Sequence, residues 1–479
     1  MVRRAVQMTD ATLKTESTAP RIDTVMAEIR RRIASRHLTS GSKLPSVRAF
    51  AKVMQVSTST VVEAYERLVA EGAIRSRPGS GFYVANTLAP LSLADIGPKL
   101  DRAVDPFWVS RLALDGRGDL LKPGCGWMPA SWMPQDVLRR AMRNLGRSDA
   151  HHLTDYSTPL GLAPLRQLLS RRLADQGVQA DAEQIILVDS GTQAIDHLCR
   201  FLLEPGETVL VDDPCYFNFH ALLRAHRVKV VGVPYTPTGP DIALFEEAVT
   251  THQPRLYITN SAIHNPTGAV LSPSTAHRVL MLAERAGVTI IEDDIFADFE
   301  HHKAPRLAAF DGLSRVVQIG SFSKTLSASV RCGYIAAPKD WIEPLTNMKI
   351  ATGFSGSQLS EVLVYSALKD VHYRRHMDVV NIKLTQAREA TTARLAALGI
   401  TPWIEPSAGI FLWCKLPDDV DAASVARHAL MKKVVLAPGN IFSQAKTASG
   451  FMRFNVSQCD DPAVFDVLEV SLFQQRADA

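Results

Sequence analysis

The sequence predicts an α/β protein in two parts: a small, basic helical module that ends in a β-hairpin, and a large domain built on a mostly parallel sheet. The first observation is length, since 479 residues are too many for one ordinary domain. The second is charge. Residues 1–85 hold 14 Lys and Arg against 7 Asp and Glu, a balance of +7, whereas the remainder holds 39 against 42, a balance of −3. The third is that apolar, β-rich runs alternate with helical stretches in the larger part.

The composition is typical of a globular protein, with 46% hydrophobic and 21% charged residues. The six cysteines are scattered without a C-x-x-C pair, which argues against disulfide frameworks and zinc sites and fits a reducing cytoplasm. No run of about 18 apolar residues is present to span a membrane. We therefore expect a cytoplasmic protein with no metal site and no membrane partner.

Three short helices are predicted in the N-terminal module. Residues 21–36 carry an apolar face formed by Ile22, Val25, Met26, Ile29 and Ile33. Pro45 and Ser46 open a second helix, and Ser57 is a suitable N-cap for a third. Gly72 comes directly after the expected end of that helix, a position where glycine is favoured.

A hairpin is predicted over residues 73–84, which completes a winged helix-turn-helix. Its third helix would present small hydroxyl residues to a groove of double-stranded DNA, and its arginines would pair with phosphates. The alternatives are a protein-interaction module and a solvated basic surface. The predicted DNA contacts are Pro45, Ser46, Arg48, Ser57, Thr58, Ser59, Thr60, Arg75, Arg77 and Gly79.

The domain boundaries follow from changes in pattern along the chain. The winged module is expected over residues 18–86. Residues 87–115 contain Pro90, Gly97, Pro98 and Pro106, a spacing that argues against one long helix and for a linker. The large domain is expected over residues 116–475. Its strands are predicted at residues 185–188, 208–211, 228–233, 255–259, 289–291 and 316–319, and they indicate a sheet covered on both faces.

Four motifs follow these strands in order: Ser190-Gly191-Thr192-Gln193, His264-Asn265-Pro266-Thr267-Gly268, Glu292-Asp293-Asp294 and Ser321-Phe322-Ser323-Lys324. Each alone has a simpler explanation: an ordinary strand-to-helix turn, an Asn-Pro turn, a helix cap and a surface lysine. Together they supply an amine, phosphate donors, an acid and an amide donor at the carboxyl edge of a sheet. This is the set of groups that pyridoxal phosphate requires.

The N-terminal module resembles the GntR-type DNA-binding domain. The resemblance is carried by residues 40–48, by Val56-Ser57, by Glu71-Gly72 and by the Gly79-x-Gly81 wing. Many members of that family have an arginine just after the serine that opens the recognition helix. This chain has Thr58-Ser59 there, so its operator sequence is not expected to follow theirs.

The four motifs resemble those of fold-type I aminotransferases, over roughly residues 120–475. The resemblance implies that Lys324 forms an internal aldimine with pyridoxal phosphate, that Asp293 pairs with the pyridine nitrogen, and that Asn265 bonds the ring oxygen. It implies a phosphate site at Gly191, Thr192, Ser321, Ser323 and Arg331, with Gln193 beside them in the cofactor site.

Three further positions match the same family. Tyr216 matches the aromatic residue that stacks on the ring. Tyr156 matches a tyrosine that reaches the phosphate of the neighbouring subunit, which implies a homodimer. Arg453 matches the arginine that binds the α-carboxylate of an amino acid in a bidentate fork.

A GntR-type module followed by an aminotransferase-like body resembles the MocR subfamily of bacterial regulators. The resemblance implies a pyridoxal-phosphate-dependent transcriptional regulator that senses an amine or amino acid through the aldimine at Lys324, in the cytoplasm and at the nucleoid when bound to DNA. Aminotransferases usually have a tyrosine where this chain has Ile295 and Phe296, so transamination is expected to be weak. Two alternatives stay open: an active aminotransferase with a fused DNA-binding domain, and a sensor of cofactor occupancy.

Overall fold

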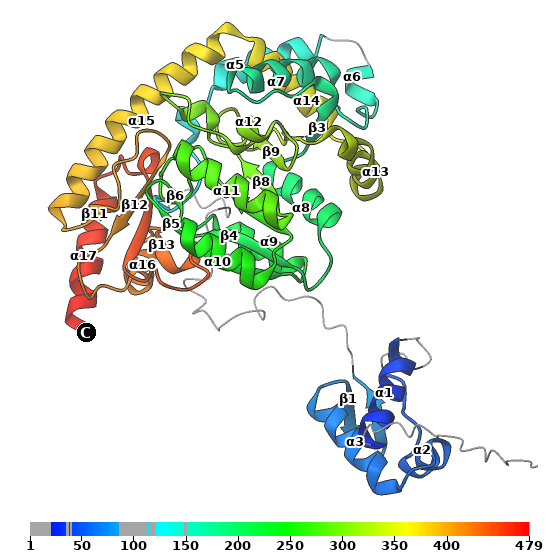
Figure 1. Ribbon diagram of the computed structural model, residues 1–479. Helices are drawn as coiled ribbons and strands as arrows, with labels where there is room; N and C mark the ends of the chain where they lie inside the picture. The colour runs from blue at the N-terminus through cyan, green and yellow to red at the C-terminus, as the bar shows by residue number, and fades with distance from the viewer. Residues whose placement is uncertain are drawn as a thin grey trace, which may run out of the picture. The chain divides into compact units, whose positions relative to one another are not determined.

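The computed structural model describes residues 21–34, 38, 41–85, 114, 120–147 and 151–478 (Figure 1). The chain forms two compact units, residues 1–92 and residues 93–479. Apart from Leu114, the predicted linker lies outside the described residues. The boundaries expected at residues 86 and 116 therefore stay predictions.

The N-terminal unit has three helices and a two-stranded antiparallel hairpin, as the sequence predicted. Its elements are α1 (Arg21–Ala34), α2 (Val47–Met54), α3 (Thr58–Ala70), β1 (Ile74–Arg77) and β2 (Gly81–Val84). The end expected for the first helix at residue 36 lies outside the described residues.

Short-range hydrogen bonds explain where the helices of this unit begin and end. Ser46 Oγ accepts from Ala49 N–H at 3.2 Å, and Ser57 Oγ accepts from Thr60 N–H at 3.1 Å, so each serine caps the helix that follows it. Gln55 ends α2 in the left-handed region with φ 53°, and Gly72 follows α3 with φ 72°. These contacts place the start of α3 immediately after a tight turn from α2.

The large unit is built on an eight-stranded sheet in the order β3-β10-β9-β8-β7-β4-β5-β6. Strands β9, β8, β7, β4 and β5 pair in parallel, whereas β10 pairs antiparallel with both of its neighbours. The strands are β3 (Ile185–Val188), β4 (Thr208–Asp213), β5 (Lys229–Thr236), β6 (Gly239–Pro240), β7 (Leu256–Thr259), β8 (Thr289–Asp293), β9 (Val316–Ser321) and β10 (Gly333–Ala336).

The sheet differs from the prediction in the bounds of several strands, among them β5, which runs three residues past its expected end, and in two strands that were not predicted, β6 and β10. Strands β4, β8 and β9 each extend two residues further than expected, because Asp213, Asp293 and Ser321 still pair with neighbours or continue the strand despite their polar side chains. Strand β10 was not predicted. It is four residues long and begins at Gly333, where a Cβ would lie 2.8 Å from the Gly320 carbonyl oxygen. So close an approach of two backbones requires glycine, a residue that sequence patterns associate with turns.

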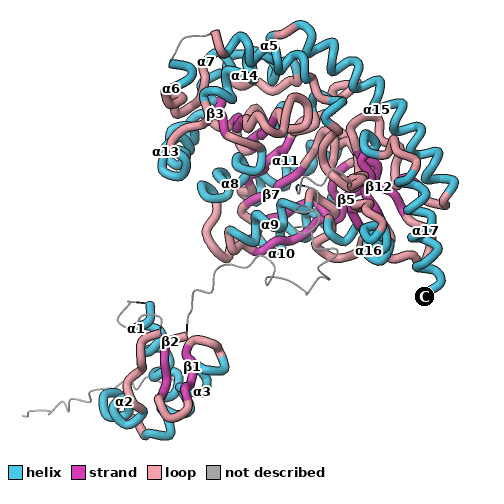
Figure 2. The backbone as a smooth tube through the Cα atoms, turned by 180° about the vertical axis from the view of Figure 1, so that it is seen from behind, coloured by secondary structure: helices cyan, strands magenta, loops and turns pink. Residues whose placement is uncertain are grey.

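Both faces of the sheet are buried, because successive residues of one strand enter different hydrophobic clusters. Ile185 and Leu187 of β3 belong to one cluster, and Ile186 and Val188 belong to the other. Helices α8 and α13 pack on the strands at the β3–β9 end, and α7, α9, α10 and α12 also contact strands of the sheet. Figure 2 shows helices on either side of the strands. This is the arrangement expected of a mostly parallel sheet.

Helices separate most of the strands from β3 to β9, and further helices precede and follow these strands along the chain. They are α5 (Gln135–Leu145), α6 (His151–Thr154), α7 (Ala163–Asp175), α8 (Gly191–Leu202), α9 (Phe217–Ala225), α10 (Ile242–His252), α11 (Pro273–Ala286), α12 (Leu307–Asp311), α13 (Ile342–Gly353), α14 (Gln358–Lys369), α15 (Val371–Ala397), α16 (Ala422–Met431) and α17 (Ala463–Asp478). Helix α8 begins at Gly191, directly after its N-cap Ser190.

A second, antiparallel sheet lies in the C-terminal part of the large unit, in the order β11-β12-β14-β13. Its strands are β11 (Thr401–Pro402), β12 (Phe411–Lys415), β13 (Ala437–Pro438) and β14 (Phe451–Asn455). Arg453 is the middle residue of β14 and pairs with Trp413 on one side and Ala437 on the other. None of the helices in the described part of the chain is long and apolar enough to cross a membrane.

Candidate functional site

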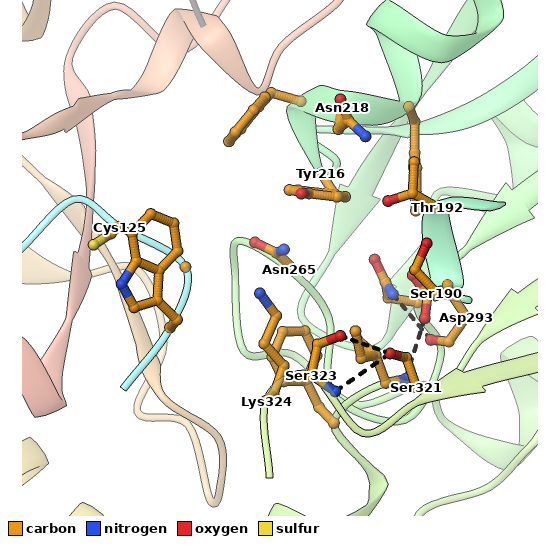
Figure 3. Close-up of a pocket in the computed structure, with 18 of the residues that line it drawn as sticks. Cys125, Ser190, Thr192, Tyr216, Asn218, Asn265, Asp293, Ser321, Ser323 and Lys324 are labelled. Atoms are coloured by element: carbon orange, nitrogen blue, oxygen red, sulfur yellow. Dashed lines mark hydrogen bonds between the residues drawn. The ribbon is translucent and has the colours of Figure 1, made fainter. Parts of the chain in front are cut away.

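The two sheets of the large unit meet at one cavity of about 360 Å³ (Figure 3). It lies where β7, β8 and β9 end and where α8 begins, and strand β14 of the second sheet contributes Arg453. The described residues that line it are Leu114, Gly124, Cys125, Gly126, Trp127, Ser190, Gly191, Thr192, Ile195, Tyr216, Phe217, Asn218, Phe219, Leu222, Asn260, Asn265, Asp293, Ile295, Phe296, Ser321, Ser323, Lys324, Ala328, Arg331, Phe411, Ala437, Ile441 and Arg453.

Lys324 follows β9 and points into the cavity, with its amine on the side of Asn265 (Figure 3). Burial, helped by the positive charge of Arg453 and opposed by the charge of Asp293, lowers the pKa of this amine to about 8. A lysine in this condition is partly neutral near physiological pH. A neutral amine is the form that attacks a carbonyl carbon.

Asp293, the last residue of β8, is the only one of three consecutive acids that lines the cavity. Glu292 accepts from Leu307 and Ala308 N–H at 2.7 and 2.9 Å, and Asp294 accepts from Arg306 at 2.7 Å, so both stabilise the fold. Burial raises the pKa of Asp293 to about 6. A buried carboxylate of raised pKa gains from a cationic partner, and a protonated pyridine nitrogen would provide one.

A group of hydroxyls and free N–H groups forms the polar end of the cavity. Ser190 Oγ caps α8 by accepting from Gln193 N–H at 3.1 Å, and Gly191 and Thr192 form the first turn of this helix. Ser321 and Ser323 share a 2.9 Å hydrogen bond between their hydroxyls (Figure 3). The N-terminus of a helix and two hydroxyl groups suit a phosphate.

Two further residues assigned to the cofactor site, Arg331 and Gln193, differ in their surroundings. Arg331 lines the cavity and precedes Cys332, whose carbonyl oxygen accepts from Ser321 Oγ at 3.3 Å, so Arg331 lies at the same polar end. Gln193 does not line the cavity. Its side-chain oxygen accepts from Asp189 N–H at 2.6 Å, which fixes the turn that precedes α8.

Arg453 is a fully buried guanidinium with 1% of its surface exposed. It donates to the Oδ1 of Asn265 at 3.0 Å and to the Gly124 carbonyl at 2.8 Å, and its Nε atom has no partner. The rings of Phe411 and Phe442 lie 4.1 and 4.7 Å from its central carbon. Burial lowers its pKa to about 10. Among the described residues no carboxylate contacts it, so the site gains from an anionic ligand.

The contact of Asn265 with Arg453 also orients the amide. Because its Oδ1 accepts from Arg453, the Asn265 nitrogen is left to donate into the cavity. Lys324 and Asn265 point toward one another, beneath Tyr216 (Figure 3). This orientation agrees with the predicted hydrogen bond from Asn265 to the ring oxygen of a cofactor.

The aromatic positions divide into three cases. Tyr216 lines the cavity. Phe296 also lines it and packs against Phe411 with ring centroids 5.7 Å apart, so an apolar edge occupies the place where aminotransferases are expected to have a hydroxyl. Tyr156 does not line it. Its side chain is 77% exposed and its ring lies 4.9 Å from the exposed ring of Phe354.

Several cavity residues were not predicted. Cys125, Trp127, Phe217 and Asn218 line it, and Cys125 lies across the cavity from the polar end (Figure 3). The segment Gly124-Cys125-Gly126 follows the β-bridge of Leu121 with Val434, and Gly124 lies so close to Leu436 that a Cβ would be 2.5 Å from its backbone. A pair of glycines around one residue was the available signal, but it does not reveal which strand the segment approaches.

The predicted DNA-contacting residues lie on the surface of the N-terminal unit. Ser46, Arg48, Ser57, Thr58, Ser59, Arg75, Arg77 and Gly79 are exposed, and Pro45 and Thr60 are partly buried. The Arg77 guanidinium lies 4.6 Å from the ring of Tyr83, and Gly79 has φ 71° at the tip of the hairpin. Tyr65 donates to the Pro45 carbonyl at 3.0 Å, which ties α3 to the start of α2.

Two family models match the chain. Residues 21–84 match the family described as bacterial regulatory proteins, gntR family. Residues 129–470 match aminotransferase class I and II. Because this second match spans most of the chain, the protein belongs to the aminotransferase class I and II family.

Curated relatives match along nearly their whole length. The HTH-type transcriptional regulator YdfD of Bacillus subtilis is 30% identical over 443 residues, which are 89% of this chain and 91% of that protein. YdcR of Escherichia coli is 28% identical over 440 residues, with 90% and 93% covered, and is also called an HTH-type transcriptional regulator. NorG of Staphylococcus aureus, another HTH-type transcriptional regulator, is 27% identical over 413 residues, with 84% and 92% covered.

Solved structures of aminotransferases share the fold of the large unit. LysN, the α-aminoadipate aminotransferase of Thermus thermophilus, superposes with a TM-score of 0.71 at 23% identity, covering 81% of this chain and 100% of that one. Kynurenine aminotransferase of Pyrococcus horikoshii gives 0.72 at 21% identity, covering 82% and 98%. Structures of both contain a form of the pyridoxal cofactor.

The cavity fits pyridoxal phosphate, which this family implies as the cofactor. A buried amine of lowered pKa, a buried acid of raised pKa and a helix N-terminus with two hydroxyls surround one space, and each suits a different part of that molecule. The gntR-family domain precedes this fold in the same chain, and the whole chain is similar to HTH-type transcriptional regulators. The protein is therefore a pyridoxal-phosphate-dependent, DNA-binding transcriptional regulator of the MocR subfamily.

Proposed function

We propose that this regulator senses a small amine or amino acid through pyridoxal phosphate held covalently by Lys324. When bound, pyridoxal phosphate supplies a carbon that exchanges one amine for another, and a ring that withdraws electrons. Asp293 pairs with the pyridine nitrogen and Asn265 donates to the ring oxygen. The phosphate is held by Gly191, Thr192, Ser321, Ser323 and Arg331. Lys324 would hold the cofactor, and Arg453 would bind the carboxylate of an arriving amino acid.

The observation that carries the proposal is that a buried lysine and a buried guanidinium line the same cavity. Among the described residues, the contacts of the Arg453 guanidinium are to two neutral oxygens and two rings, and none is to a carboxylate. A ligand that carries both an amine and a carboxylate would satisfy both groups. It would also change the charge and contacts in the cavity, and only such differential contacts can shift the balance between two conformations.

The second candidate function is transamination. Lys324 and Asp293 are the groups that such a reaction needs, and both line the cavity. Phe296 argues for slow turnover, because it provides no hydroxyl to the ring oxygen. A sensor of cofactor occupancy alone would have no use for Arg453, so that alternative is less favoured.

We further propose a homodimer in which Tyr156 reaches the phosphate of the partner subunit. Tyr156 is 77% exposed in one chain and does not line the cavity of its own chain, which supports this arrangement. A two-fold symmetric protein suits an operator of two half-sites. Because the chromosome is the target, we place the protein in the bacterial cytoplasm, at the nucleoid when it is bound to DNA.

The test combines a spectrum, a DNA-binding assay and a product assay on the purified protein. Amines and amino acids are screened for a shift of the cofactor absorbance, and active compounds are then added with a keto acid acceptor and with DNA fragments that the protein selects from its genome. We expect a spectral shift and altered DNA affinity at the same ligand concentration, with little product. Fast formation of a new amino acid would favour the aminotransferase instead.

The carboxylate site has its own control. Arg453→Lys keeps the positive charge but loses the planar guanidinium that can bind a carboxylate through two hydrogen bonds. Arg453→Ala removes both features. The cofactor spectrum of each variant reports whether the cavity is intact. An unchanged response of Arg453→Ala to the active ligand would refute the assignment of Arg453 and leave the rest of the proposal standing.

A further inference from the structure

We infer that Val62, an exposed residue of α3, reads thymine in the DNA that this regulator binds, through contact with the C5-methyl group of that base. This inference concerns the N-terminal unit and goes beyond the sensing function proposed above, since it is independent of the ligand that the large unit binds. It follows from the exposure of Val62, from its neighbours on α3 and from the residue types that the start of this helix lacks.

Val62 is an apolar residue that the core of the N-terminal unit does not use. Its side chain is 37% exposed, whereas Val61 and Leu68 of the same helix are fully buried. Val62 is not part of the hydrophobic cluster that joins the helices of this unit to its hairpin. Valine also forms helices less readily than the polar residues that are common on exposed helix faces. Neither packing nor helix formation therefore accounts for valine at this position.

Val62 stands where a DNA-binding helix contacts bases. The N-terminal unit matches the gntR family of regulatory proteins, and its elements have the order of a winged helix-turn-helix. In such a unit the second helix of the turn lies in the major groove, with its N-terminal residues on the base edges. Thr58 is the first residue of α3 and Val62 follows it by four residues, so the two side chains lie on one side of the helix. Both residues are exposed.

The start of α3 has none of the side chains that read guanine or adenine through paired hydrogen bonds. Arginine and lysine read guanine in this way, and asparagine and glutamine read adenine. Residues 58–66 contain none of these four types, and the first cation of the helix, Arg67, pairs with Glu63 at 2.7 Å. Apolar contact remains as a means of reading a base. Thymine is the base that presents a methyl group in the major groove.

The hydroxyl groups at the start of α3 bond one another. Ser57 Oγ lies 2.8 Å from Ser59 Oγ and 2.7 Å from Thr60 Oγ1, and it accepts from Thr60 N–H at 3.1 Å. This cluster uses most of the hydroxyl protons that the three residues could donate to a base. It also caps the first turn of α3, so the helix that carries Val62 begins in a defined direction.

Charge attracts the N-terminal unit to DNA but does not select a base. Residues 1–85 hold 14 Lys and Arg against 7 Asp and Glu, a balance of +7, and phosphates attract this charge whatever the sequence. Val62 is uncharged, so it contributes where a base offers an apolar surface. Burial of one methyl group changes affinity by about 4-fold, and a thymine in contact with Val62 should therefore matter by about that factor.

The experiment measures the DNA affinity of the full-length protein with pyridoxal phosphate bound and without added amine or amino acid. The probe is the tightest-binding duplex that the protein selects from a random-sequence pool, in which each thymine is then replaced singly by deoxyuridine. This replacement removes the methyl group and keeps the hydrogen-bonding groups of the base. We expect at least one replacement to weaken binding by about 4-fold. If every thymine can be replaced without loss of affinity, the inference is overturned.

The variant Val62→Ser tests whether Val62 makes the contact. Serine removes both methyl groups at an exposed position, which leaves the core of the unit unchanged. The loss of about 4-fold that deoxyuridine causes in the parent protein should vanish in Val62→Ser. Val53→Ser is the matched control and should keep this loss, since Val53 is 64% exposed but belongs to α2. A loss of the same size in Val62→Ser would assign the methyl contact to another residue and overturn the inference.

Two further measurements separate a methyl contact from other kinds of contact. Val62→Ser should leave the slope of log affinity against log salt unchanged, because no phosphate contact is lost, and a change of about one unit would contradict the inference. At the sensitive thymine position, a pair of 5-methylcytosine with guanine should bind about 4-fold more tightly than a pair of cytosine with guanine, since these pairs differ only in the methyl group. Equal affinity for these two duplexes would also overturn the inference.

Discussion

Lys324 shows how a single residue acquires a function from its surroundings. Exposed lysines are protonated and inert, but burial lowers the pKa of this one to about 8. We expect the protein to be yellow, and borohydride to fix the cofactor on one peptide that contains Lys324. Lys349 is the internal reference, because it too is buried with a lowered pKa but donates to the Pro159 carbonyl at 2.7 Å. A label on Lys349, or an unchanged absorbance in Lys324→Ala, would exclude the assignment.

Asp293 predicts how cofactor retention depends on pH. Its raised pKa of about 6 belongs to the protein without cofactor, so the carboxylate is charged above this pH and neutral below it. Only the charged form attracts a protonated pyridine nitrogen. Affinity for pyridoxal phosphate should therefore be full above about pH 6 and fall as the pH drops below it, as measured by equilibrium dialysis. Asp293→Asn should bind more weakly and lose this dependence; a similar fall in the variant would assign it to another group.

Phe296 predicts a gain of activity. A tyrosine at this position would return a hydroxyl to the cavity beside the ring oxygen, where the structure has an apolar edge packed on Phe411. Phe296→Tyr should raise the single-turnover rate of transamination by roughly 100-fold, the lower end of the range that one positioned proton donor contributes. Phe299→Tyr is the control, because Phe299 packs beside Phe296 but does not line the cavity. Equal rates in the parent and Phe296→Tyr would show that the hydroxyl is not what limits turnover.

At the scale of elements, function is concentrated where strands end and helices begin. In the N-terminal unit the start of α3 exposes three hydroxyl residues, with Arg48 exposed on the preceding helix. In the large unit the ends of β8 and β9 and the start of α8 place Asp293, Lys324 and Gly191 around one cavity. Both arrangements exploit the unpaired N–H groups and the dipole of a helix N-terminus.

The exposed arginines of the N-terminal unit predict the salt dependence of DNA binding. Arg48 has no ion-pair partner among the described residues, so it is available to a phosphate. Arg48→Gln should weaken binding and reduce the slope of log affinity against log salt by about one unit. Arg67→Gln is the matched control, because Arg67 on α3 pairs with Glu63 at 2.7 Å. Equal slopes for the parent and Arg48→Gln would show that Arg48 does not contact phosphate.

At the scale of the whole molecule, the cavity is predicted to be completed by a second subunit. Tyr156→Phe should weaken cofactor retention, and Lys324→Ala should abolish covalent attachment. Mixed and reassembled, these two variants should form heterodimers in which one cavity has both defects and the other is intact. Half of the cavities in such heterodimers should then hold cofactor as tightly as the parent protein.

The control for this complementation is to mix each variant with itself, which leaves every cavity defective. Light scattering at the same concentration measures the oligomeric state. A monomer that retains cofactor at normal affinity would contradict both the dimer and the role of Tyr156.

The sequence by itself determined the order of domains, the fold class and most of the chemical groups at the site. These features depend on local causes: Ser57 caps a helix, Gly72 follows one, and Asp293 and Lys324 each come at or after the end of an apolar strand. Such signals lie within a few residues of the feature that they predict. For this reason the elements could be found without knowledge of their neighbours.

The tertiary structure alone decided which groups meet and what lies between them. Strand β10 depends on a backbone contact between Gly333 and Gly320, and one cavity is lined by Trp127 and Ile441, which are more than 300 residues apart in sequence. The lowered pKa values of Lys324 and Arg453 arise chiefly from burial. Burial and long-range approach are properties of packing, and packing is set by the whole chain rather than by a local pattern.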